Sequence, residues 1–172
     1  MRAHNYRTVK GQPYTRKKFV RGFPPPKITK FTMGDTKSRF EYEAKLLALE
    51  KAQIRHNALE AARIATNRYL GNKLSENYCF RVRPYPHAIL RENKMIFGAH
   101  ADRLQDGMRR SFGKPIGTAA RVKPKQVVMT VNVNAEGVQA AKEALKRGSA
   151  KLPIPCKIII EKTQAVEEAK AS

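Results

Sequence analysis

Residues 101–122, ADRLQDGMRRSFGKPIGTAARV, contain the glycines, lysine and arginines from which a phosphate-binding loop could be built. In a P-loop, four residues separate two glycines, and a Ser or Thr follows the lysine in order to bind the metal ion. Here five residues separate Gly107 from Gly113, and Pro115 follows Lys114 at the metal-binding position. A dinucleotide-binding fingerprint is also absent, because no expected strand leads into these glycines at the required spacing. The spacing therefore excludes both kinds of nucleotide loop.

The sequence supports neither a nucleophilic site nor a metal site. Ser111 and His100 could act as nucleophile and base. Asp102 or Asp106 could orient the base, but nothing in the spacing brings these residues together. No Cys-x-x-Cys pair occurs, and the histidines are too scattered for a metal-ligand set: His4, His56, His87 and His100. We therefore expect a protein that is not an enzyme and has no catalytic residue, metal ion or cofactor. An RNA-modifying enzyme is the alternative, and it would need a cofactor pocket and a positioned base.

Positive charge is the strongest compositional signal. The 172 residues include 35 Lys and Arg against 14 Asp and Glu, which gives a net charge of +21. Such an excess repels itself in isolation and predicts a polyanionic partner, with nucleic acid favoured. A membrane surface is the weaker alternative, because no segment combines a basic face with a bulky apolar one.

The apolar residues and cysteines bear on the compartment. No run of about eighteen apolar residues exists, and no apolar stretch follows the basic N-terminus, so we expect neither a membrane span nor a secretory signal. Cys79 and Cys156 lie far apart in strand-like segments. This placement favours free thiols in a reducing compartment over a disulfide, and we expect the cytoplasm.

Residues 1–34 combine cations, aromatic rings, glycines and prolines without a single acid. The glycines and the proline run 24–26 disfavour a regular helix, so we predict an extended basic arm. Its cations suit phosphates, and its rings suit stacking on RNA bases or docking on the protein body. A disordered basic tail and an architectural DNA-binding protein are the alternatives, but rings interleaved with cations favour RNA with exposed bases. The rings are Tyr6, Tyr14, Phe19, Phe23 and Phe31.

Two helices are expected. The first has Asn57 and Glu60 as a capping pair and Gly71 as its left-handed stop. Its inward stripe comprises Leu59, Ala62, Thr66, Tyr69 and Leu70, with Ile64 on the opposite side. The second helix follows a cap at Asn134 and stops at Gly148. Its inward face carries Val138, Ala141 and Leu145.

Strands are expected on both sides of each helix. Residues 41–50 have helix propensity and also alternate as a strand does, but a cap at Asn57 implies a break before the helix and favours a strand. Alternation also predicts a strand around Phe80 and Val82, which Pro84 and Pro86 end. Two further strands are predicted in QVVMTVNVN and PCKIIIEK. Two strand–helix–strand units indicate an α+β fold, with a mixed sheet and two helices packed on one face. We expect one such domain over residues 35–163 and a flexible polar tail at 164–172.

A second basic segment, residues 98–122, is predicted to project from this domain as a long loop. Arginine heads match phosphate oxygens and stack on exposed bases, and glycines let the backbone approach RNA closely. A solvated charged loop is the alternative, although a loop of this length is uncommon unless it is functional or disordered. The cations here and just beyond are Arg103, Arg109, Arg110, Lys114, Arg121, Lys123 and Lys125.

Motifs along nearly the whole chain resemble one protein family. They are PYTRKKFVRGFPPPKI, FTMGD, LEAARIATNRYL, FRVRPYPHAILRENKM and GAHADRLQDGMRRSFGKPIGTAARV. The family is ribosomal protein L-sixteen of bacteria, called L-ten-e in archaea and eukaryotes, and the short C-terminal end resembles the archaeal type. The resemblance implies an α+β protein that binds large-subunit ribosomal RNA near the peptidyl transferase region, beside A-site transfer RNA. It also implies a strand at 41–50 and a loop at 101–115 that projects toward the transfer RNAs.

These expectations define the partners and the site. The partners are large-subunit ribosomal RNA, A-site transfer RNA and neighbouring large-subunit ribosomal proteins, in the cytoplasm and without a membrane. The expected RNA-binding residues are Arg2, Arg7, Lys10, Tyr14, Arg16, Lys17, Lys18, Arg21, Arg81, Arg83, His87, Arg91, Lys94, Arg103, Arg109, Arg110, Lys114, Arg121 and Lys123. The expected transfer-RNA-facing residues are Arg103, Met108, Arg109, Arg110, Phe112 and Lys114.

Overall fold

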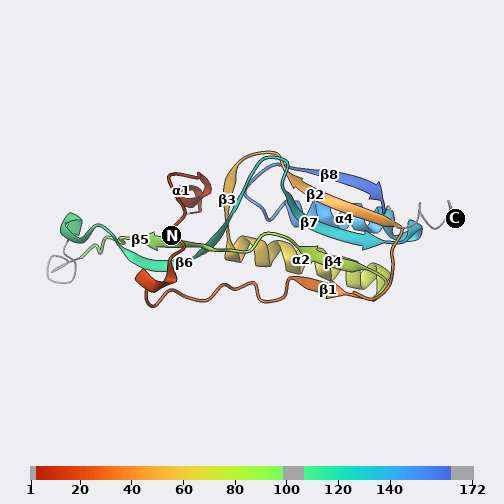
Figure 1. Cartoon of the computed structure of the whole chain (residues 1–172), viewed down its shortest axis with the longest axis horizontal. Coiled ribbons are helices and arrows are strands. Elements are labelled where there is room, and N and C mark those ends of the chain that lie inside the picture. Colours follow the sequence, from red (N-terminus) through yellow and green to blue (C-terminus); the bar gives the residue numbers. More distant parts are fainter. Residues whose placement is uncertain (1–2, 99–106, 164–172) are drawn as a thin grey trace.

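The computed structural model describes residues 3–98 and 107–163, which form two antiparallel sheets and two long helices (Figure 1). The five-stranded sheet has the order β1 (Thr32–Gly34), β4 (Cys79–Val82), β7 (Val127–Val133), β2 (Tyr42–Ala48) and β8 (Cys156–Lys162). The three-stranded sheet has the order β3 (Ala52–Arg55), β6 (Lys114–Val122) and β5 (Ala88–Glu92). The helices are α1 (His4–Arg7), α2 (His56–Leu74) and α4 (Val138–Ser149). Short 3-10 turns occur at η1 (Lys17–Phe19), η2 (Gly107–Arg110) and η3 (Ala135–Gly137).

The helices α2 and α4 cover one face of the five-stranded sheet and leave its other face open (Figure 1). Alternation along β2 directs Ala44, Leu46 and Ala48 into the core, where Leu59 of α2 and Leu145 of α4 are also fully buried. The α+β class and the two helices on one face are therefore confirmed. The single mixed sheet is wrong: the strands divide between two sheets, and every described strand pairing is antiparallel.

The expected helix ends need correction. Strand β3 runs directly into α2, which begins at His56, so Asn57 lies inside the helix and does not cap it. At the other end α2 continues past Gly71 to Leu74. Ser75 takes the positive φ there, 52°, and its N–H donates to the Gly71 carbonyl over 3.2 Å.

The second helix differs in the same way. Gly148 is buried within α4, not beyond it, and Asn134 precedes the turn η3 without a side-chain capping bond. A β-carbon at position 148 would lie 2.3 Å from Thr66 Oγ1, so this glycine allows α2 and α4 to approach closely.

The strands at 41–50, around Phe80, at 127–133 and in PCKIIIEK are confirmed as β2, β4, β7 and β8. The projecting loop at 98–122 is wrong in its second half, because residues 114–122 form β6, the central strand of the smaller sheet. Pairing with β3 on one side and β5 on the other satisfies its backbone and buries residues 117–120. Residues 99–106 of the expected loop lie outside the described part of the chain.

Both cysteines are free, as expected. Cys79 is buried in β4, Cys156 is half-buried in β8, and burial raises the pKa of each thiol. Thiols held in their neutral form are poor nucleophiles, so both belong to the packing of the sheet. Within residues 3–98 and 107–163, no helix has the length and apolar composition needed to span a bilayer.

Candidate nucleic-acid interface

The N-terminal segment, residues 3–31, docks along the protein and does not project from it. Its first half packs on the three-stranded sheet: the Ile89 N–H donates to the Tyr14 carbonyl over 2.8 Å, and Gln53 Nε2 donates to the Tyr6 carbonyl over 3.1 Å. Further along, Val20 and Ile28 are buried, and the chain then enters β1. The last residues expected in an extended arm are thus a strand of the larger sheet.

Arg121 of β6 joins this segment to the sheet. Its Nε donates to Gln53 Oε1 over 3.1 Å, its Nη1 to the Gly11 carbonyl over 2.7 Å and its Nη2 to the Lys10 carbonyl over 3.3 Å. Three acceptors from two separate segments therefore fix one guanidinium in place. Arg121, which the sequence assigns to RNA contact, therefore also holds the N-terminal segment on the three-stranded sheet.

Arg91 of β5 has a similar task near the end of the smaller sheet. Its guanidinium carbon lies 4.7 Å from the centre of the Tyr14 ring and 3.2 Å from that of Phe112, and its Nη1 donates to the Phe112 carbonyl over 2.5 Å. The Tyr14 and Phe112 rings meet edge-on with centres 5.7 Å apart. This cation–π cluster holds the turn before β6 against the N-terminal segment.

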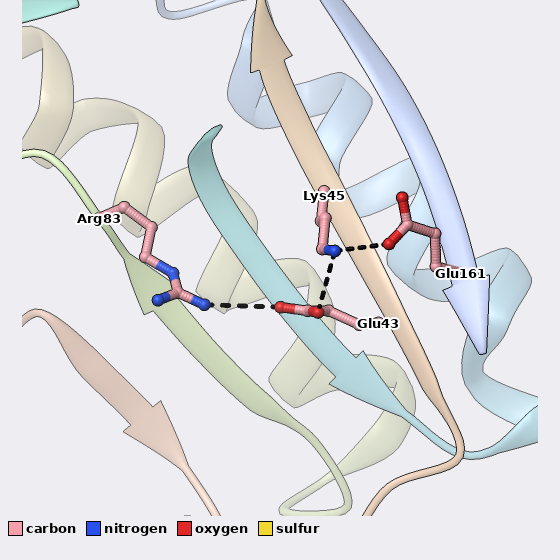
Figure 2. Close-up of polar contacts among 4 residues, drawn as sticks. All are labelled: Glu43, Lys45, Arg83 and Glu161. Atoms are coloured by element: carbon pink, nitrogen blue, oxygen red, sulfur yellow. Dashed lines mark hydrogen bonds and ion pairs between the residues drawn. The ribbon is translucent and has the colours of Figure 1, made fainter. Parts of the chain in front are cut away.

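Other predicted cations are paired with carboxylates. Arg7 lies 2.9 Å from Glu50, and both side chains are about half exposed. Figure 2 shows a row of alternating charge on the open face of the five-stranded sheet, in which Arg83 lies 3.5 Å from Glu43. Lys45 lies 3.3 Å from Glu43 and 2.5 Å from Glu161, and its hydrogen bond to Glu161 raises the pKa of Lys45. The row is charge-balanced, so this part of the sheet attracts a polyanion weakly.

The remaining predicted cations are free to meet a polyanion. Their side chains are exposed and form no ion pair or hydrogen bond with another described side chain. They are Lys10, Arg16, Lys18, Arg21, Arg81, Lys94, Arg109, Lys114 and Lys123. Most lie on the N-terminal segment or around β5 and β6, the same half of the molecule (Figure 1).

Exposed rings accompany these cations. His87 is exposed, its ring centre lies 4.5 Å from that of Tyr85, and Tyr85 stacks on Phe31 at 5.5 Å. Tyr85 was not assigned to RNA contact from the sequence, because only the fold brings this ring, after β4, beside Phe31, before β1. Farther along, Phe112 is 60% exposed and Met108 79% exposed. Phe97, which the site prediction also omitted, is 94% exposed.

Arg2 and Arg103 lie outside the described residues, as do His100, Asp102 and Asp106 of the rejected triad. Lys17 and Arg110 belong to η1 and η2. In the described part of the chain, no three His, Cys, Asp or Glu side chains are grouped so that they could hold a metal ion.

Burial lowers the pKa of His56, and the neighbouring charges of Lys27 and Arg55 lower it further. The Lys27 N–H donates to His56 Nδ1 over 2.8 Å, which requires an unprotonated nitrogen at that position. His56 therefore ties residue 27 of the N-terminal segment to the start of α2.

This chain is similar in sequence to known proteins over most of its length. The sequence model of a family described as "Ribosomal protein L16p/L10e" matches residues 9–159. A relative from Hyperthermus butylicus is 55% identical over 94% of this chain and 89% of its own, and one from Staphylothermus marinus is 53% identical over 92% of each. A third, from Sulfolobus acidocaldarius, is 56% identical over 90% of each chain. All three are named "Large ribosomal subunit protein uL16", and they confirm the resemblance to the archaeal type. The chain therefore belongs to the ribosomal protein L16p/L10e family, whose members are structural components of the ribosome and not enzymes.

Proposed function

We propose that this protein is a cytoplasmic structural constituent of the large ribosomal subunit that binds large-subunit ribosomal RNA. The observation that carries the proposal is the group of exposed, unpaired cations on the N-terminal segment and around β5 and β6. Ribosomal RNA supplies phosphates in the number needed to neutralise a net charge of +21. The relatives named as large ribosomal subunit proteins support the same assignment.

The distribution of paired and unpaired charges indicates which part of the protein binds RNA. The half of the molecule that contains β5, β6 and the N-terminal segment meets RNA, and the balanced row Glu43, Lys45, Arg83 and Glu161 does not. The open face of the larger sheet is then available to neighbouring ribosomal proteins. Residues 35–163 act as the supporting domain, and residues 1–34 and 164–172 are its extensions.

The proposed function also includes contact with transfer RNA. Residues 107–114 present Met108, Arg109, Phe112 and Lys114 to A-site transfer RNA near the peptidyl transferase region. Exposed cations and a partly exposed ring on one turn suit a backbone phosphate and an unstacked base. Peptide-bond chemistry belongs to RNA, and the protein contributes position.

Sedimentation tests the ribosomal part. The full chain should co-sediment with large subunits after a moderate salt wash, and release of the whole chain by that wash contradicts the assignment.

For the transfer-RNA part, Arg109→Ala should slow A-site binding of transfer RNA to reconstituted ribosomes without changing the melting temperature of the protein. The control is Lys123→Ala, which removes an exposed cation from the turn after β6. Equal rates for both variants contradict a role of the 107–114 turn.

A further inference from the structure

A polar cavity of about 230 Å³ lies between the N-terminal segment and the three-stranded sheet. Residues 5–14 form one wall, and β3, β5 and β6 form the other. A water molecule needs only about 10–15 Å³ of such space, so the cavity has room for a larger polar group. The protein's own side chains do not fill this volume.

The charge of the lining has one sign. Lys10, Arg91 and Arg121 line the cavity, and none of its lining residues is an Asp or Glu. The described hydrogen bonds of both arginines end on neutral oxygens, and neither guanidinium forms an ion pair with a carboxylate in the described part of the chain. A carboxylate that acts on the lining is that of Glu92, which raises the pKa of Tyr6 as a secondary effect after burial. Cations held together in a partly buried space repel one another, and a bound anion relieves that repulsion.

Hydrogen bonds within the protein fix the position of Arg121 before any ligand binds. The three hydrogen bonds of Arg121 hold its guanidinium plane still and use three of its five N–H groups. Two N–H groups stay available, one on each terminal nitrogen. A guanidinium fixed in this way loses little conformational entropy when it binds the oxygens of a phosphate.

Neutral polar side chains complete the lining. Asn5, Thr8 and Gln12 come from the N-terminal segment, and each provides at least one donor for a phosphate or ribose oxygen. We propose that this cavity binds one phosphodiester group of an RNA backbone, with Arg121 and Lys10 as its anchoring cations. The proposal rests on the RNA-binding function proposed above and adds the chemical group that this position recognises.

An RNA strand fits the surroundings better than a free anion does. Arg16 and Lys18 continue the same segment beyond the cavity, and both are exposed without a described ion pair. A strand with one phosphate in the cavity would place its next phosphates near further cations. An isolated inorganic anion would leave those cations unused.

The test uses the full chain with ¹⁵N-labelled arginine, and it follows the Nε–H signal of Arg121 by NMR. The probes are the dinucleotide ApA, which contains one internal phosphodiester, adenosine, which contains none, and inorganic phosphate. The main variant is Lys10→Gln, because the Lys10 side chain has no described hydrogen bond or ion pair to lose. The matched control is Lys73→Gln, which removes the same charge from an exposed position on α2, outside the cavity and outside the proposed RNA-binding surface.

ApA should shift the Arg121 signal in a saturable manner, and adenosine should not. Lys10→Gln should weaken ApA binding about tenfold, the size of one charge-assisted hydrogen bond, whereas Lys73→Gln should change it less than twofold. Three results would overturn the proposal: no saturable shift with ApA, an equal shift with adenosine, or binding of inorganic phosphate but not of ApA. Equal weakening by both variants would also overturn it, because attraction would then be diffuse.

Co-sedimentation of the same proteins with large subunits separates the two levels of the proposal. A chain that co-sediments but shows no ApA-dependent shift contradicts the phosphodiester site alone. A chain that does not co-sediment contradicts the ribosomal function.

Discussion

The guanidinium carbon of Arg91 lies 3.2 Å from the centre of the Phe112 ring, at the point where the turn before β6 returns to the sheet. Tyr14 meets the same ring edge-on, so the N-terminal segment, β5 and the turn converge on one arginine. All three residues were expected to touch RNA. The structure joins them to one another and leaves Phe112 60% exposed.

Replacing Phe112 with Leu should destabilise the protein modestly. The substitution keeps an apolar side chain but removes the ring from Arg91, and a partly exposed cation–π contact contributes about 0.5–1 kcal/mol. Urea unfolding measures the loss. Phe97→Leu is the control, because Phe97 is 94% exposed and has no described ring or cation contact. If both variants unfold at the same urea concentration as the parent chain, the Arg91 contact does not stabilise this turn.

Replacing Arg121 with Ala should loosen the N-terminal segment. The change removes the donors to the Lys10 and Gly11 carbonyls and leaves Gln53 Oε1 without its partner. We expect a loss of about 1.5–3 kcal/mol in the free energy of unfolding and faster proteolysis within residues 1–20. Lys123→Ala removes a neighbouring exposed cation whose side chain has no described hydrogen bond, and it should change neither quantity. Unchanged proteolysis of Arg121→Ala would show that other contacts hold the segment.

The arginines show why sequence alone identifies the charged surface but not the role of each charge. Composition predicts a polyanionic partner, because that follows from a sum over residues. Arg91 and Arg121 bind backbone carbonyls of residues 112, 10 and 11, and no local pattern reveals such acceptors. The sequence therefore cannot separate arginines that also bind the protein's own backbone from arginines that are exposed without such bonds.

Some strands can likewise be predicted from the local sequence, whereas others cannot. β2 has seven residues whose burial alternates, and β7 has seven residues of which most are apolar or β-branched, so their local sequence predicts them. β6 contains a proline and a glycine and is buried along most of its length, since it pairs on both sides. Pairing partners more than twenty residues away decide its conformation, and the local sequence resembles a loop. β3 has only four residues and no readable period.

Replacing Gly148 with Ala should destabilise the packing of α4 on α2. The new β-carbon would lie 2.3 Å from Thr66 Oγ1, closer than two such atoms can approach. Overpacking of this kind costs about 1–3 kcal/mol, more than the gain of about 1 kcal/mol from replacing a helical glycine. Thermal or urea unfolding measures the result.

Thr66→Ala should rescue the Gly148→Ala variant. Thr66 Oγ1 is buried and has no hydrogen-bond partner among the described residues, so its removal is inexpensive and clears the space. The double variant should recover most of the lost stability. If the two losses simply add, the clash with Thr66 is not their cause.

His56 gives the fold a predictable pH dependence. Its pKa is lowered in the folded protein, first by burial and then by Lys27 and Arg55, so below a pH of about 6.5 the unfolded chain binds a proton that the folded one resists. The free energy of unfolding should therefore fall as the pH decreases from about 6.5 toward the lowered pKa. Above that window His56 is neutral in both states and contributes no pH dependence.

The variant His56→Asn isolates this effect. Asn provides an oxygen acceptor for the Lys27 N–H without a titrating ring. Urea unfolding at pH 7.5 and 5.5 should show a larger loss for the parent chain than for the variant. Identical losses contradict the assignment to His56.

The most direct test of RNA binding by the N-terminal segment compares two triple variants in salt-dependent co-sedimentation with large subunits. One replaces Arg16, Lys18 and Arg21 with Gln; the control replaces Lys73, Lys142 and Lys146 of α2 and α4, which are equally exposed and have no described ion pair. Both lose the same charge. The first should dissociate at lower salt, with the log–log slope of affinity against salt reduced by about 2–3, and the control should follow the parent chain. Equal release of the two variants would contradict an RNA contact by this segment.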